Sequence, residues 1–295
     1  MQELLTIVLP CYNEAQNIPL FFPELLDFAR EKNFRIIAVN DGSSDQSELL
    51  LADFAEKYPN FTLINHKLNK GYGAALKTGL QAVKTDFAIT IDADGQHRLH
   101  DVEKCFTVIQ KTNADMVVGG RQNNQSGTCR TLGKMIIKLF AKSLLTLPVN
   151  DLNSGMKCYR MNEVREYFAL CPDTMAFSDV ILLLMANDRK LVLEIPIEIN
   201  ARTAGKSTIG LHSAVNTVAE ILNLSVLLRP MTTFFRMGII FVAMGLGWGI
   251  FTYIRSVSVT STAVMLMIFG FMCFVLGLLG EQLSKIRKAL AKMVK

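Results

Sequence analysis

The stretch that decides the fold is Phe87-Ala88-Ile89-Thr90-Ile91-Asp92-Ala93-Asp94-Gly95-Gln96, in which an apolar run leads directly into two carboxylates. A short apolar run of this kind predicts a buried strand. Similar runs occur at residues 4–9, 35–39, 62–65 and 116–118. The segments between them carry apolar residues at helical spacing. Strands that alternate with helices predict an α/β domain with a mainly parallel, Rossmann-like sheet.

The composition places an apolar segment at the end of the chain. Half of the 295 residues are hydrophobic and 19% are charged, which excludes a disordered chain and a strongly basic nucleic-acid-binding chain. Residues 237–254 and 256–280 contain no charged residue. Each stretch is close to the ~20 residues that cross a bilayer. We therefore expect a transmembrane hairpin at residues 234–284.

Basic residues cluster around the two apolar stretches, and only Arg255 lies between them. They are Arg229, Arg236, Lys285, Arg287, Lys288, Lys292 and Lys295. This is the positive-inside pattern of a hairpin with both ends in the cytoplasm. No basic export signal precedes the first strand, so we expect a cytoplasmic catalytic domain. The expected parts are a catalytic domain at 1–210, an amphipathic juxtamembrane helix at 211–233, the hairpin at 234–284 and a basic tail at 285–295.

The acidic turn after the decisive strand predicts a metal site. Asp92 and Asp94 are two residues apart at a strand end, and Gln96 adds a third oxygen ligand. Hard cations such as Mg²⁺ or Mn²⁺ prefer oxygen ligands, and they offset the charge of a departing nucleoside diphosphate. Asp92 is also suited to bind the ribose of a nucleotide. The alternative for this motif alone is a solvated acidic turn, and for His97 and His100 a capping or surface role.

Other strand ends carry polar motifs suited to a nucleotide. Residues 10–14 offer a ring and a carboxylate for a base, with a helix capped by Asn13 as the alternative. Asp41 is placed to accept a hydrogen bond from a base N–H. Residues 69–75 combine two glycines and a lysine before a helix, which suits an anionic group, or equally a tight turn. In parallel sheets, ligands gather at this edge.

Taken in order, these motifs resemble the family 2 glycosyltransferases with a GT-A fold, and specifically the polyprenyl-phosphate hexose synthases related to dolichol-phosphate mannosyltransferase. The resemblance covers nearly the whole chain. The segments that carry it are residues 10–14, 40–43, 70–73, 92–96, 119–121, 151–155 and 202–207.

The resemblance implies a role for each matching residue. Nucleotide-sugar binding falls to Pro10, Tyr12, Glu14, Asp41, Lys70, Asp92, Arg202, Lys206 and Ser207. The metal ligands are Asp92, Asp94 and Gln96, so Asp94 counts as catalytic. Residues 202–207 follow an expected strand at 191–199 and would close over the diphosphate, unless they contact anionic lipid instead.

The acceptor side of the site depends on two arginines and one carboxylate. Arg121 and Arg130 match the positions that bind the phosphate of a lipid acceptor in the family. A phosphate monoester is largely ionised at neutral pH and needs little help from a base. Asp151 is therefore expected as an orienting residue or a base, or equally as a brace for the turn at 153–155. The chain departs from many relatives at Gly120, Leu152 and Asn153, which affects the choice of donor more than the reaction.

These inferences predict a membrane-anchored, metal-dependent, inverting glycosyltransferase. It would move a hexose-type sugar from a nucleotide donor, UDP- in preference to GDP-, onto polyprenyl phosphate for modification of envelope glycans. The hairpin supports such an acceptor because a polyprenyl tail stays in the bilayer. Gly245 and Gly249 indicate helix contact within the hairpin or between protomers. The alternatives are another membrane lipid as acceptor, and a non-catalytic scaffold that binds nucleotide sugars.

Overall fold

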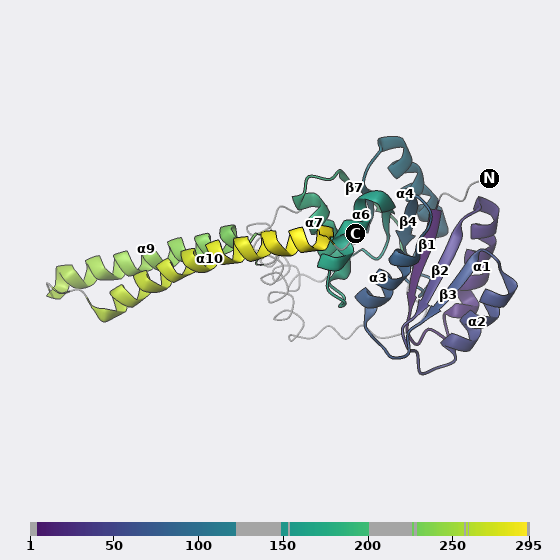
Figure 1. Cartoon of the computed structure of the whole chain (residues 1–295), viewed down its shortest axis with the longest axis horizontal. Coiled ribbons are helices and arrows are strands. Elements are labelled where there is room, and N and C mark those ends of the chain that lie inside the picture. The colour runs from purple at the N-terminus through teal and green to yellow at the C-terminus, as the bar shows by residue number, and fades with distance from the viewer. Residues whose placement is uncertain are drawn as a thin grey trace. The chain divides into compact units, whose positions relative to one another are not determined.

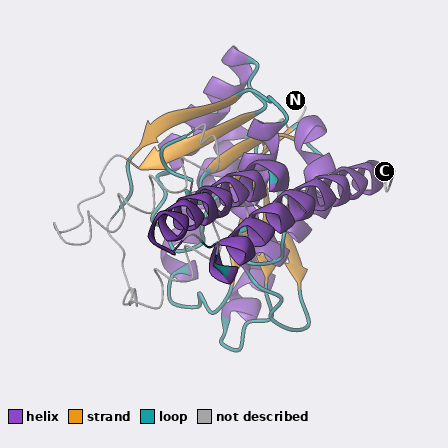
Figure 2. Ribbon diagram, turned by 90° about the vertical axis from the view of Figure 1, so that its left-hand side faces the viewer, coloured by secondary structure: helices purple, strands orange, loops and turns teal. Residues whose placement is uncertain are grey.

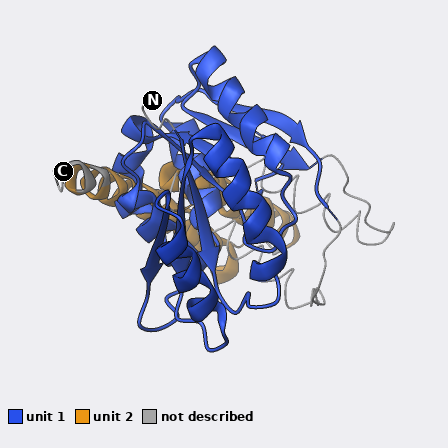
Figure 3. Cartoon of the chain, turned by 90° about the vertical axis from the view of Figure 1, so that its right-hand side faces the viewer, with its two compact units in different colours: residues 1–126, 147–208 blue, residues 127–146, 209–295 orange. Residues whose placement is uncertain are grey.

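The computed structural model describes residues 5–121, 149–152, 154–200, 229–256 and 260–293, together with residues 226 and 258. The chain divides into two units (Figure 3). One consists of residues 1–126 and 147–208, and the other of residues 127–146 and 209–295. Most of the amphipathic segment expected at 211–233 lies outside the described residues.

The first unit contains a seven-stranded sheet in the order β3-β2-β1-β4-β6-β5-β7 (Figure 1). Its strands are β1 Leu5–Cys11, β2 Arg35–Asn40, β3 Phe61–Asn65, β4 Phe87–Thr90, β5 Met116–Arg121, β6 Lys157–Arg160 and β7 Val192–Ile197. β6 runs antiparallel to both β4 and β5, and the other pairs are parallel. The expected mainly parallel α/β sheet is confirmed, and β6 is an addition that the apolar runs did not predict.

Helices alternate with the strands along the chain, and Figure 2 shows the strands in orange with helices in purple packed beside them. They are α1 Ile18–Lys32, α2 Ser47–Lys57, α3 Tyr72–Ala82, α4 Leu99–Thr112, α6 Met161–Val164, the 3-10 helix η1 Arg165–Leu170 and α7 Phe177–Asn187. Buried side chains of α1 and α4 form the main core with one face of the sheet. α3 packs on the other face, where a Cβ atom at Gly79 would lie 2.5 Å from the side chain of Val8.

The strand directions bring the polar motifs to one edge of the sheet. Cys11 at the end of β1 is opposite Asn40 at the end of β2, which is opposite Asn65 at the end of β3. β4 and β5 are both antiparallel to β6, so they run parallel to each other and also end at this edge. The segments after five strands therefore emerge together, as expected for a ligand site of an open α/β sheet.

The second unit contains the long helices α9, Pro230–Ser256, and α10, Ser261–Met293. Both are long and apolar enough to cross a membrane, judged by length and composition. They pack through glycines: a Cβ atom at Gly238 would lie 2.8 Å from the carbonyl oxygen of Gly270, and one at Gly245 would lie 2.9 Å from that of Ala263. Helix contact within the hairpin is thus present at Gly245. Contact between protomers stays a prediction.

Candidate active site

Asp92, two residues after β4, is surrounded by donors. Tyr72 donates its hydroxyl to Oδ1 of Asp92 at 3.0 Å, and Nε2 of His97 lies 3.5 Å from Oδ2. Burial alone would raise the pKa of this carboxyl, but hydrogen bonds from His97 and Tyr72 and the charge of Arg121 outweigh it, so the pKa falls below its usual value. The carboxylate is therefore ionised at neutral pH.

Asp94 and Gln96 complete the acidic turn that the sequence singled out. Oδ1 of Asp94 accepts the backbone N–H of Gln96 at 3.1 Å, and both side chains are half-buried. No group of three or more His, Cys, Asp or Glu suited to a metal occurs among the residues that the structure describes. The third ligand that the sequence analysis expects is the Gln96 amide. Two carboxylates and an amide oxygen fit the donor set that Mg²⁺ or Mn²⁺ prefers.

His97 is buried, so the surface or capping role considered for it is wrong. Its side chain is 5% exposed, and among the described residues Nδ1 has no hydrogen-bond partner. α4 begins only at Leu99, because residue 97 pairs with Ile199 in an isolated antiparallel bridge. The carbonyl of Gln96 also accepts the N–H of Asn200. This pairing fixes the acidic turn against the segment that follows β7.

The loops after β1 and β2 hold each other. Asn13, with a left-handed φ of 54°, accepts the N–H of Ser44 at 2.8 Å through its side chain. It does not cap α1, which begins at Ile18 with Asn17 as N-cap, so that alternative is wrong. Glu14 accepts a hydrogen bond from Asn17 at 2.6 Å. The Tyr12 ring is 47% exposed, as stacking on a base requires. Pro10 lies within β1, and its contact with a nucleotide stays a prediction.

Asp41 is buried and accepts three hydrogen bonds from the chain itself. His66 Nδ1 lies 2.6 Å from Oδ1, and the backbone N–H groups of Lys70 and Gly71 donate at 2.9 and 2.8 Å. Nε2 of His66 in turn contacts Thr78. The sequence analysis found Asp41 but missed His66, which lies 25 residues away. Lys70 is exposed at this edge, and the roles of both residues in nucleotide binding stay predictions.

Arg121 and Asp151 form a bidentate ion pair at the end of β5. Nε and Nη2 of the arginine donate to the two carboxylate oxygens at 2.7 and 2.9 Å, and the Arg121 N–H also donates at 3.1 Å. Burial opposes the charge of Asp151, but the hydrogen bonds from Arg121 outweigh it and lower the pKa of the carboxyl. This geometry suits the orienting role expected for Asp151. Its role as a base stays a prediction.

Glu194 on β7 supports this ion pair, and the sequence analysis missed it. Its carboxylate accepts the backbone N–H groups of Asn150 and Asp151 at 2.8 and 3.0 Å. A Cβ atom at Gly120 would lie 2.2 Å from Oε1 of Glu194. A side chain at residue 120 would therefore require the Glu194 carboxylate to move. No signal in the β7 sequence marks this function.

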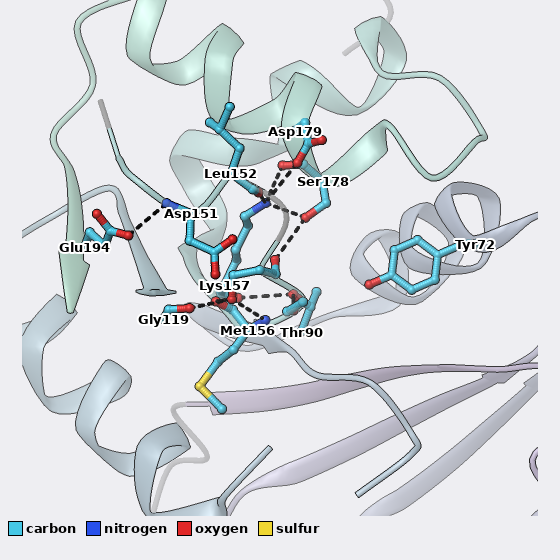
Figure 4. A network of polar contacts seen from close by, with 12 residues as sticks. Tyr72, Thr90, Gly119, Asp151, Leu152, Met156, Lys157, Ser178, Asp179 and Glu194 are labelled. Carbon is cyan, nitrogen blue, oxygen red and sulfur yellow. Dashed lines mark hydrogen bonds and ion pairs between the residues drawn. The ribbon is translucent and has the colours of Figure 1, made fainter. Parts of the chain in front are cut away.

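Lys157, at the start of β6, is a fully buried lysine that the sequence analysis also missed (Figure 4). Its ammonium donates to the carbonyl oxygens of Leu152 and Ser178 at 2.7 and 2.8 Å and to the Ser178 hydroxyl at 2.5 Å. Oδ1 of Asp179 lies 3.8 Å away. Burial lowers the pKa of Lys157 to about 8. The predicted ligand residues Arg130, Arg202, Lys206 and Ser207 lie outside the described residues.

Comparison with known proteins identifies the family to which the chain belongs. Residues 6–165 match the model of glycosyl transferase family 2. The chain belongs to this family. The match confirms the resemblance inferred from the strand-end motifs. Residues 229–286 match a second model, the GtrB C-terminal hairpin, which covers most of α9 and α10.

The curated relatives of this family 2 chain include transferases of two kinds. A dolichyl-phosphate β-glucosyltransferase ALG5A of Trichomonas vaginalis is 28% identical over 56% of this chain and 55% of its own length. The ALG5D relative of the same organism is 26% identical over 77% and 75%. An undecaprenyl-phosphate 4-deoxy-4-formamido-L-arabinose transferase of Edwardsiella ictaluri is 22% identical over 96% and 90%. The chain thus spans about half of the first relative and most of the other two.

Solved structures share the fold of this family 2 chain. A glucosyl-3-phosphoglycerate synthase from Mycobacterium tuberculosis, solved with Mn²⁺, UDP and phosphoglyceric acid, matches with a TM-score of 0.56 at 16% identity, over 76% of this chain and 78% of that one. Residues 1–349 of S. aureus TarS, in complex with UDP, match with a TM-score of 0.53 at 16% identity, over 76% and 64%. At such identity the likeness shows the fold alone.

Proposed function

We propose that this chain transfers one hexose-type sugar from a nucleoside-diphosphate sugar to a polyprenyl phosphate, with inversion at the anomeric carbon. The observation that carries the proposal is the pairing of a family 2 domain with a GtrB-type hairpin in one chain. Relatives that cover most of the chain are named for transfer to dolichyl or undecaprenyl phosphate. A hairpin in the bilayer suits an acceptor whose prenyl tail cannot leave it.

A divalent cation would be held by Asp92, Asp94 and Gln96. When bound, it would supply positive charge for the diphosphate leaving group. Manganese in the complex of the Mycobacterium tuberculosis neighbour supports this choice in general, and both Mg²⁺ and Mn²⁺ suit the oxygen ligands. The lowered pKa of Asp92 supports the same role, because ligand carboxylates must be ionised.

The chain's own residues supply the rest of the site. Tyr12 would stack on the base and Asp41 would accept a base N–H, and uridine is the nucleoside we favour, as in the UDP complexes of both neighbours. Arg121, oriented by Asp151, would bind the acceptor phosphate. This phosphate is ionised near neutral pH, so its oxygen can attack in line with the departing diphosphate without a strong base.

The hairpin would anchor the domain to the membrane, with the domain on the cytoplasmic side. Basic residues flank both ends of the hairpin and support this orientation. Labelling of single introduced cysteines from either side of sealed vesicles would test it. Labelling of the domain and of residues 256–260 from the same side would contradict it.

The function is tested by incubating the purified chain, in detergent micelles, with Mn²⁺, a panel of nucleotide sugars and a short polyprenyl phosphate. Mass analysis of the lipid fraction should show one added hexose-type residue from one donor, and we expect this donor to be a UDP-sugar. Transfer to another lipid but not to polyprenyl phosphate would favour the second acceptor class. If no donor gave any lipid product, the proposal would fail and a binding scaffold would remain.

A further inference from the structure

The buried lysine of β6 contacts the residue that follows Asp151 of the acceptor-side ion pair. Lys157 is 0% exposed, and burying an ammonium is costly unless its donors and charge are compensated. Here the three N–H donors meet three oxygens within 2.8 Å, from Leu152 and Ser178. The slot is therefore built for the charged side chain, not for an apolar one.

The contacts of Lys157 lead to the segment that carries Asp151. Its Nζ donates to the carbonyl of Leu152, the residue after Asp151 in the chain. From the other side, Glu194 accepts the N–H groups of Asn150 and Asp151. The backbone on both sides of Asp151 is thus fixed by one cation and one anion (Figure 4). Asp151 in turn fixes the guanidinium of Arg121 through two hydrogen bonds.

The same ammonium connects this segment to α7. It donates to the carbonyl and the hydroxyl of Ser178 and lies 3.8 Å from Asp179, both in the first turn of that helix. The segment before α7 packs against the first turn of α3, where a Cβ atom at Gly73 would lie 2.3 Å from the carbonyl oxygen of Thr174. Lys157 therefore joins the acceptor side of the sheet edge to the helix that borders the donor side.

We propose that Lys157 is a positioning residue of the acceptor site, and that its ammonium holds the Leu152 carbonyl so that Asp151 aims Arg121 at the acceptor phosphate. This assignment rests on the proposed function for the identity of the acceptor. It does not place Lys157 in contact with any substrate. A misplacement of about 1 Å in an oriented group lowers the rate about 100-fold, so loss of the ammonium should be visible in turnover.

The charges that face Lys157 come from four elements. Asp179 of α7, Asp151 before β6 and Asp92 after β4 favour the ammonium, and Arg121 at the end of β5 opposes it. Above pH about 8 the neutral amine keeps two N–H donors for three oxygens. The phenols of Tyr72 and Tyr159 have pKa values raised by burial, so they stay protonated in this range.

The test compares Lys157→Met and Ser178→Ala with the control Lys32→Met, in the full chain. Lys32 makes a 2.8 Å ion pair with Glu103 at the end of α1, away from the site edge. Lys157→Met should lower kcat/KM for a short polyprenyl phosphate about 100-fold with the donor KM within about twofold. Ser178→Ala should give a smaller loss of the same kind, and Lys32→Met none. The turnover of the wild type should also fall above pH about 8. The pH profile of Lys157→Met should lack this fall.

Hydrogen exchange supplies a readout that needs no substrate. In Lys157→Met, backbone amides in residues 149–156 should exchange at least tenfold faster, with the β1–β3 part of the sheet unchanged. This readout decides the positioning role even if the wild type proves to transfer no sugar. Near-wild-type exchange, unchanged acceptor kinetics, or an equal loss of donor and acceptor binding would overturn the proposal. If Lys157→Met does not fold, Ser178→Ala decides by the same criteria.

Discussion

Gly155 lies so close to Asp92 that a Cβ atom at residue 155 would be 2.4 Å from Oδ2 of the carboxylate. Real Cβ atoms do not approach other atoms this closely. Gly155 belongs to the turn before β6, and Asp92 follows β4, which pairs with β6. The backbone of one strand end therefore limits where the predicted metal ligand of its neighbour can lie.

We expect Gly155→Ala to displace the Asp92 carboxylate and lower turnover about 100-fold, with more Mn²⁺ needed for half-maximal rate. The measurement is a Mn²⁺ titration of lipid-linked sugar formation. Gly247→Ala is the control, because a Cβ atom there meets nothing within 4 Å. It should keep activity within about twofold. Wild-type turnover and Mn²⁺ dependence in Gly155→Ala would show that the turn can move aside without affecting Asp92.

The acidic turn makes a separate prediction. Asp94→Ala removes one of two carboxylates and should abolish metal-dependent turnover, since a cation site of three ligands loses a charged one. The folded state should survive, because the Asp94 side chain accepts a hydrogen bond from the backbone N–H of Gln96, only two residues away. Asp53→Asn is a matched control, as Asp53 pairs only with Lys57 among the contacts described on α2. Metal-dependent turnover in Asp94→Ala would refute the metal assignment.

The parallel part of the fold could be predicted from the sequence because its strands are continuous apolar runs. β6 could not. Its residues Lys157–Arg160 begin and end with a cation, so only two positions look like strand interior. The buried lysine is satisfied by carbonyls that the tertiary fold brings to it, and a sequence pattern contains no record of such acceptors. Positions where the tertiary contacts contradict the local sequence pattern are expected at functional sites, and Lys157 is such a position.

The candidate site, like the fold, contains residues that the sequence predicts and supporting residues that it does not. Asp92, Asp94, Asp41, Arg121 and Asp151 could be found because each follows an apolar run or lies in an ordered motif. Their supporting partners match no short motif: His66 follows β3, Glu194 lies on β7, and Lys157 begins β6. The sequence indicates a capping or surface role for His97, but residue 97 pairs with Ile199 and lies before α4. Pairing between segments about 100 residues apart is not encoded in local periodicity.

The ion pair between Arg121 and Asp151 predicts non-additive substitutions. Arg121→Gln and Asp151→Asn should each raise KM for the acceptor about tenfold. The acceptor KM of the double variant should not exceed that of the single variant with the higher KM. The donor KM should change little. Arg30→Gln, which removes an exposed pair with Asp27, is the control for loss of an arginine.

Steady-state kinetics over both substrates measure this cycle. Effects that multiply in the double variant would mean that the two residues act independently. A fall in kcat for Asp151→Asn far beyond that for Arg121→Gln would instead give Asp151 the role of a base. The structure favours non-additive effects and an orienting role for Asp151, because both of its carboxylate oxygens already accept hydrogen bonds from Arg121.

The lowered pKa of Lys157 predicts that activity and the free energy of unfolding change with pH in opposite directions. Burial lowers its pKa from 10.5 to about 8 in the folded chain. Between these values the unfolded chain binds a proton that the folded chain does not, so the free energy of unfolding rises with pH in this window. The rise is about 3 kcal/mol at most for such a shift. Activity should fall over the same range, because the amine loses a donor.

The measurement is the free energy of unfolding of the catalytic domain, followed by circular dichroism of the full chain in detergent micelles at pH 7.5 to 10.5. The difference between wild type and Lys157→Met should shift in favour of the wild type as the pH rises. Lys32→Met should show no such shift in this window, since its ion pair with Glu103 raises the pKa of Lys32 and is lost only above it. A flat difference for Lys157→Met would mean that Lys157 keeps the same charge when folded and unfolded, and the alkaline loss of activity would then need another group.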